Sequence, residues 1–278
     1  MTAATATPPD RSAASPLRVT QARVVLSEWT KFRSLRSTVI TLAVAVVITI
    51  VISLVFALVM GSNYATMAPA DKHSFNAAST SLNGDLFAQL AFGVLGVLVM
   101  TGEYSTGMIR ATLTAVPRRL PVLWAKITVF TLCAGIIALI TNLVSFYAGQ
   151  AGLSGHDLQV SLTSPGAIRI VGGATLYVTA VGIMGIALGA LVRSTAGAIS
   201  SLVGLLFVIP PVLNLLPQSW TTYFGKYLPA DAGQASWVFH PGPGLTDRLS
   251  PWAGFVVMCL WVIGLVVIAA IQLLRRDA

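Results

Sequence analysis

The chain has 278 residues, of which 55% are hydrophobic and only 9% are charged, and its mean hydropathy is +0.82. Because a soluble domain carries roughly 25% charged residues, this composition excludes a soluble globular protein, a disordered chain and a disulfide scaffold. The only cysteines, Cys133 and Cys259, lie in apolar runs and are expected to be buried, with no disulfide or metal role.

The first 37 residues precede the first long apolar run. Residues 1–16 are small and polar and contain proline, which predicts a disordered tail. Residues 17–37 are predicted to hold an amphipathic helix, since Arg23 and Lys31 lie opposite an apolar stripe. The stripe consists of Ala22, Leu26, Trp29 and Phe32. Such a helix typically lies flat in the membrane interface; the alternative is a basic flank that only orients the first span.

A helix that crosses the bilayer core needs about 20 apolar residues, and six stretches approach that length. Since backbone polar groups must be satisfied inside lipid, each stretch is predicted to be a helix. The predicted spans are residues 38–60, 86–101, 121–147, 170–192, 196–216 and 252–274, within a membrane domain of residues 38–276. The sequence therefore predicts an all-α, polytopic membrane protein.

Two spans carry irregular features. The second has only 17 uncharged residues between Asp85 and Glu103, which is the lower limit for crossing. The fifth contains Pro210 and Pro211, which lack backbone donors, so its last turn is predicted to be irregular.

Basic residues are distributed unevenly over the two sides of this arrangement. Thirteen of the seventeen lie on the side of both termini, and an excess of Lys and Arg in short loops marks the cytoplasmic side. Both termini are thus predicted to be cytoplasmic, and the net charge of +8 needs no nucleic-acid partner. The thirteen are Arg11, Arg18, Arg23, Lys31, Arg33, Arg36, Arg110, Arg118, Arg119, Lys126, Arg193, Arg275 and Arg276.

The segment between the second and third spans, residues 102–120, contains signals for a short cytoplasmic helix. Ser105 or Thr106 is predicted to cap this helix, which runs to Thr114 or Ala115 and stops at Pro117. A short helix beneath the bilayer, with charges of both signs, is suited to binding a cytosolic partner.

Glu103, at the membrane exit of the second span, has two interpretations. It contacts such a partner, or it pairs with Arg110 or Lys126 and so lowers the cost of a charge near lipid.

On the other side, residues 61–85 and 149–169 are predicted to be polar connectors. Residues 217–251 are rich in aromatic side chains, Gly and Pro, which predicts short interfacial helices. In the fourth span, Gly185 and Gly189 have the spacing of a close helix contact, most simply one within the chain.

Motifs for nucleotide hydrolysis, metal binding and nucleophilic catalysis are absent from the sequence. It has no G-x-x-x-x-G-K-[ST], H-E-x-x-H or G-x-S-x-G motif, and no acidic residue lies in the middle of a span, which disfavours an ion-coupled transporter. An enzyme would have to assemble its site from scattered loop residues, namely His73, His156, Asp157 and His240.

Two cytoplasmic motifs resemble those of a known family. The run EWTKFRSLRST, residues 28–38, precedes the first span, and GEYSTGMIRATLTAVPRRLPVLWAK, residues 102–126, follows the second. Together they resemble the membrane subunits of type-2 ATP-binding-cassette (ABC-2 type) transporters, especially the compact actinobacterial permeases. KYLPADAGQA, residues 226–235, is similar to a stretch that those permeases carry before the last span. The resemblance covers residues 17–276.

The resemblance implies an elbow helix before the first span and a coupling helix that contacts an ATPase. The elbow residues would be Glu28, Trp29, Lys31, Arg33 and Arg36. The coupling residues would be Glu103, Thr106, Gly107, Arg110, Pro117, Arg118 and Arg119.

The resemblance also implies a function. The chain would be a non-enzymatic permease subunit in the bacterial cell membrane, paired with an identical or a different second permease and exporting a hydrophobic or amphipathic substrate. ATP and Mg²⁺ would bind to a separate ATPase chain, and no cofactor to this one. The alternative is a non-transporting membrane scaffold or sensor that still binds an ATPase.

Overall fold

The computed structural model describes residues 20–34, 36–109, 119–238 and 249–275, so the predicted tail, residues 1–16, lies outside the described part. Six helices, one of them interrupted by a π turn, are long and apolar enough to cross a membrane, which confirms the predicted all-α polytopic fold. The spans are α2 (Arg36–Asn63), α5 (Asp85–Ser105), α7 (Arg119–Ser154), α8 (Ala167–Val192), α9 (Thr195–Val203) with α10 (Ile209–Leu213), and α13 (Pro251–Arg275).

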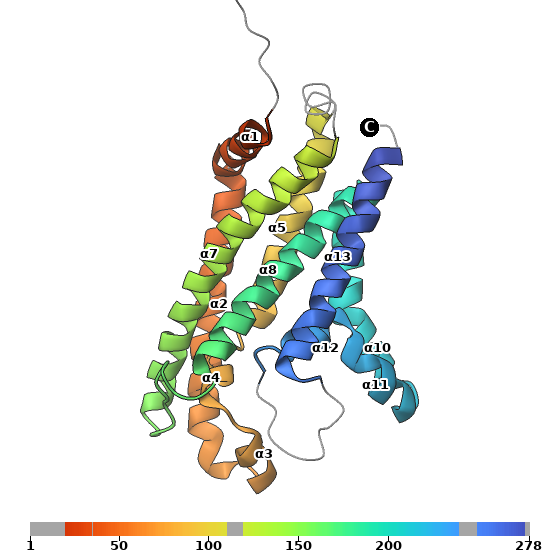
Figure 1. Cartoon of the computed structure of the whole chain (residues 1–278). Helices are drawn as coiled ribbons and strands as arrows, with labels where there is room; N and C mark the ends of the chain where they lie inside the picture. The colour runs from red at the N-terminus through yellow and green to blue at the C-terminus, as the bar shows by residue number, and fades with distance from the viewer. Residues whose placement is uncertain (1–19, 35, 110–118, 239–248, 276–278) are drawn as a thin grey trace, which may run out of the picture.

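Shorter helices lie at both ends of the bundle. The amphipathic helix predicted before the first span is α1 (Gln21–Ser34), and it lies at the same end as the C-terminal turn of α13 (Figure 1). We call this end the α1 end and the opposite one the α12 end. The helices at the α12 end are η2 (Tyr64–Thr66), α3 (Pro69–Ser74), α4 (Ala77–Thr80), α11 (Gln218–Phe224), η4 (Gly225–Tyr227) and α12 (Pro229–Gln234).

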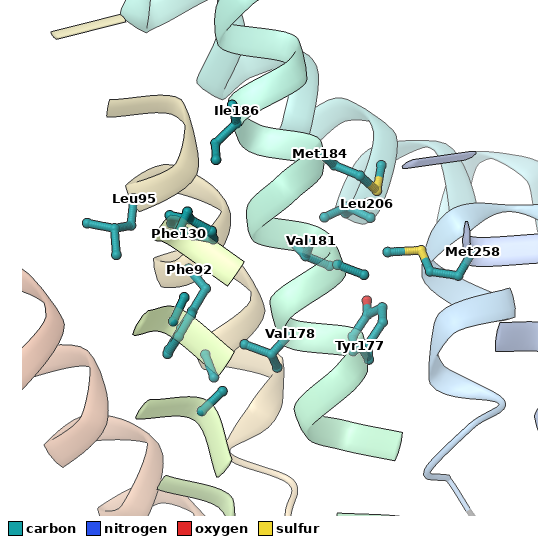
Figure 2. Packing of buried hydrophobic residues seen from close by; sticks show 14 of the residues in the cluster. Phe92, Leu95, Phe130, Tyr177, Val178, Val181, Met184, Ile186, Leu206 and Met258 are labelled. Atoms are coloured by element: carbon teal, nitrogen blue, oxygen red, sulfur yellow. The ribbon is translucent and has the colours of Figure 1, made fainter. Parts of the chain in front are cut away.

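The centre of the bundle is α8, which packs against α5, α7, α9 and α13. Its span is the most enclosed of the six: 78% of an apolar stretch of 18 residues is buried, against 56% for α5 and 22% for α13. Around α8, buried side chains of α5, α7, α13 and the π turn after α9 pack against those of α8 itself (Figure 2). They include Phe92, Phe130, Tyr177, Leu206 and Met258. The outer faces of α2 and α13 are left with exposed apolar side chains, as expected where lipid replaces water.

Glycines allow α5 and α8 to approach closely. A Cβ on Gly96 would lie 2.0 Å from the carbonyl oxygen of Gly182, and a Cβ on Gly185 would lie 2.1 Å from that of Gly93. Small residues at such contacts let helix backbones approach in membranes, where no hydrophobic force drives helices together. The glycine spacing in the fourth span therefore serves packing within the chain.

The helix boundaries differ most from the predictions at two places. The helix α5 continues to Ser105, and the hydroxyls of Ser105 and Thr106 donate back to the carbonyl of Gly102. The predicted N-cap at these residues is therefore wrong, since they end one helix instead of starting another. At the other place, α7 runs on to Ser154, so the predicted connector 149–169 is shorter than expected.

The fifth span is irregular, as its prolines predicted. Gly204–Val208 forms a π turn, in which the backbone N–H of Ile209 donates to the carbonyl of Gly204. Pro210 and Pro211, which cannot donate, stand in the first turn of α10. The irregularity thus precedes the prolines by about one turn. The connector predicted at residues 61–85 also contains η2, α3 and α4, and the short helices predicted in residues 217–251 are confirmed by α11 and α12.

Candidate functional site

The helix α1 is held against α7 by an apolar contact. Val24 of α1 packs on Val122 and Ala125 of α7, and all three side chains are buried. The amide of Gln21 donates to the carbonyl of Pro121. The buried face of α1 is therefore the one that carries Val24 and, one turn later, Glu28, while Leu26 and Trp29 of the predicted stripe are exposed.

Four charged side chains meet where α1 crosses α5 and α7. The ammonium of Lys126 lies 2.6 Å from Glu28 Oε2 and 2.7 Å from Glu103 Oε1. The ammonium of Lys31 lies 2.7 Å from Glu28 Oε1 and 2.8 Å from Glu103 Oε1. We call these four residues the charge cluster. It joins three helices, and two of its members, Glu28 and Lys126, are 98 positions apart in the sequence.

The charge cluster is largely removed from solvent. Only 2% of the Lys126 side chain is exposed, with 4% for Glu28 and 5% for Glu103, whereas Lys31 is 29% exposed. Two carboxylates and two ammonium groups cancel in formal charge, which is the condition under which buried charges are tolerated. Burial opposes the charged form of Lys31, but hydrogen bonds and attraction from Glu103 and Glu28 outweigh it and raise the pKa of this ammonium above its ordinary value.

One acceptor in the cluster is unsatisfied. Glu103 Oε2 is buried and has no hydrogen-bond partner among the described residues, whereas both oxygens of Glu28 are bonded. A buried acceptor without a donor is unfavourable by about 1–3 kcal/mol. The cluster also borders a cavity of about 200 Å³, whose other walls include Leu98, Met108 and Phe130.

The charge cluster lies at the base of the predicted coupling segment. Glu103 is two residues before the end of α5; Thr106 follows as its C-cap, and Gly107 has a positive φ of 69°. Met108 and Ile109 are helical again, and Arg110, Pro117 and Arg118 lie outside the described residues. Arg119 is the first residue of α7. The α5 terminus and the start of α7 are thus both tied to α1 by the cluster.

A second group of contacts reaches the same end of α5. The guanidinium of Arg193, in the turn between α8 and α9, lies 5.4 Å from the ring centre of Tyr104. The hydroxyl of Thr195 donates to that of Thr101 at 2.9 Å. The end of α5 is therefore bonded to α1 and α7 on one side and to the α8–α9 turn on the other.

The predicted site residues separate into three groups in the structure. Glu28, Lys31 and Glu103 come together, whereas Trp29, Thr106 and Gly107 are exposed. Arg33 and Arg36 belong to α1 and α2, but their side chains are outside the description. The interpretation that Glu103 pairs with Lys126 is confirmed.

The amino-acid pattern did not predict that α1 takes part in this pairing. A lysine inside an apolar span requires an acidic partner, but the sequence does not indicate that Glu28 would be one.

In the part of the chain that the structure describes, no three His, Cys, Asp or Glu side chains gather in a group that could hold a metal ion. The cluster's carboxylates and ammonium groups are engaged with one another, so its chemistry is that of a link between helices. No protein-family model matches this chain, and the search of curated proteins finds no relative.

Proposed function

We propose that this chain is the permease subunit of an ABC-2 type transporter that exports a hydrophobic or amphipathic molecule. The proposal is supported by the resemblance of residues 28–38 and 102–126 to such permeases and by the six membrane-crossing helices. A separate ATPase would supply the energy, and a second permease chain would complete the complex. The excess of basic residues at the α1 end supports a cytoplasmic position for that end.

The observation that carries the proposal is the charge cluster. It ties α1, α5 and α7 together at the base of residues 102–120, where the resemblance expects the ATPase to bind. A push on this segment would reach α5 directly. It would reach α1 and α7 through the three short ion pairs that connect these helices, in a low-dielectric site where such pairs are strong. These three helices would therefore move as one unit.

Transport would require the helix bundle to have two arrangements that the ATPase distinguishes. Closure of the ATPase dimer on ATP would favour one of them through differential contacts with the segment after α5. The contacts of Tyr104 with Arg193 and of Thr101 with Thr195 extend the same link to α8 and α9. Movement of the α5 end would then change the packing around α8, at the centre of the bundle.

Affinity purification of the tagged chain from its native membranes in mild detergent tests the proposal. We expect a soluble ATPase with a phosphate loop to co-purify and to hydrolyse ATP. Replacing residues 108–116 by a Gly/Ser linker should abolish its recovery without preventing membrane insertion of the chain. Recovery of the chain alone under several gentle conditions would contradict the proposal. Recovery of the ATPase without any substrate export would instead favour the scaffold or sensor.

A further inference from the structure

An apolar cavity lies between the first turns of α8 and α13 at the α12 end, remote from the charge cluster. Its volume is about 350 Å³. The side chains around it are almost all apolar, and Gly172 and Gly173 leave the surface of α8 bare beside them. The larger apolar side chains are Ile168, Leu176, Pro251, Trp252 and Phe255.

The cavity belongs to the surface that faces lipid. Trp252 is 70% exposed and Ile168 is 66% exposed, both within helices long and apolar enough to span the membrane. A Cβ on Gly172 would meet nothing within 4 Å, whereas one on Gly173 would collide with the backbone of Ser236. The cavity therefore has open space above Gly172, bounded by side chains that suit a hydrocarbon chain.

One cation borders this apolar space. Arg169, the third residue of α8, donates from Nη1 to the carbonyl of Ser236 at 2.8 Å, which fixes the guanidinium beside the cavity. A guanidinium has five N–H donors, and no described carboxylate forms an ion pair with this one. Several donors thus remain for a ligand, next to a cavity without other charge.

We infer that this cavity binds an anionic phospholipid, with its phosphate on Arg169 and an acyl chain along Gly172, between Leu176 and Trp252. A guanidinium binds phosphate through paired, charge-assisted hydrogen bonds. Arg169 lies at the beginning of its span, and Trp252 at that of α13, the depth at which headgroups and interfacial tryptophans lie. A headgroup cation, as in phosphatidylcholine, would offset the phosphate charge and weaken binding. The inference requires only a membrane location and is independent of the proposed transport function.

Native mass spectrometry of the full chain tests the inference. The chain is reconstituted in nanodiscs with equal amounts of phosphatidylglycerol and phosphatidylcholine, released, and analysed for lipids that it retains. Wild type should retain phosphatidylglycerol preferentially. Arg169→Gln should lower the ratio of the two lipids about tenfold, because glutamine has no positive charge to favour the anionic lipid over the zwitterionic one. Gly172→Leu should reduce retention of both lipids, because its Cβ meets no other atom within 4 Å and its side chain would occupy the acyl-chain space.

Two controls make the test specific. Lys226→Gln removes another basic residue at the α12 end, one that borders a different cavity, and should leave the lipid ratio unchanged. Soluble glycerol 3-phosphate should not displace the lipid. An unchanged ratio in Arg169→Gln, or unchanged retention in Gly172→Leu, would overturn the inference. An equal effect of Lys226→Gln would instead indicate general attraction by positive charge, and displacement by glycerol 3-phosphate would indicate a soluble anion site.

Discussion

The ammonium of Lys126 is the most enclosed charge of the charge cluster, and it balances both Glu28 and Glu103. Taking such a group out of water is costly, so the cluster depends on having all its members. Glu103 is the member with an oxygen left unsatisfied. At this scale the cluster acts as a specific link between helices and only weakly as a source of stability.

Lys126→Met should destabilise the purified chain by about 3–5 kcal/mol, because among the described residues it leaves the two buried carboxylates with Lys31 as their only cation. The change appears as a lower midpoint of thermal unfolding in detergent. The triple variant Glu28→Gln, Glu103→Gln, Lys126→Met should recover most of the loss, since it removes both buried carboxylates and leaves only the partly exposed ammonium of Lys31 in the cluster. A single Lys126→Met variant as stable as wild type would show that the cluster is not closed as described.

The residue patterns predicted part of this site. The sequence predicted a pair between Lys126, in an apolar run, and Glu103, at the end of a span, because either charge alone near lipid would be costly. Glu28 and Lys31 appeared only as members of an amphipathic helix, and which face of that helix is buried depends on how α1 folds back on α7. The stripe of Leu26 and Trp29, predicted to face the membrane interface, is exposed, while Val24 packs on α7. The pattern did not predict this second contact.

At the scale of elements, the contact between α5 and α8 determines the shape of the bundle. The spacing of Gly185 and Gly189 indicated a close contact, but its partners on α5, Gly93 and Gly96, could not be identified from one sequence. Span number followed from hydropathy, whereas the π turn at Gly204–Val208 depends on backbone bonds that hydropathy does not report.

Gly96→Ala should destabilise the bundle by about 1–3 kcal/mol, the usual effect of overpacking, because its Cβ would meet the Gly182 carbonyl at 2.0 Å. Gly264→Ala in α13 is a matched control: nothing lies within 4 Å of its Cβ, and alanine favours a helix. Thermal unfolding in detergent should therefore separate the two variants in opposite directions. Equal stability of both would mean that α5 and α8 are not in backbone contact.

At the scale of the whole molecule, α1 and the last turn of α13 lie at one end of the bundle (Figure 1). Hydropathy predicted this arrangement, since an even number of spans returns the chain to its first side. The uneven distribution of basic residues adds the prediction that this end is cytoplasmic.

Single cysteines test that orientation after Cys133 and Cys259 are replaced by alanine. Ser154 at the α12 end and Thr106 at the α1 end are both exposed. In intact cells, a membrane-impermeant maleimide should label Ser154→Cys at once, and Thr106→Cys only after permeabilisation. The reverse pattern would place the α1 end outside the cell and remove the basis for binding a cytosolic ATPase.

We propose that an ATPase binds at the α1 end, where α5 stops. The most direct measurement is site-directed cross-linking in native membranes with a thiol-reactive benzophenone on Thr106→Cys, with Ser154→Cys as the matched control. We predict that Thr106→Cys captures a protein that mass spectrometry identifies as a phosphate-loop ATPase, and that Ser154→Cys does not. Absence of an ATPase from the Thr106→Cys products, or equal capture at both positions, would contradict the account.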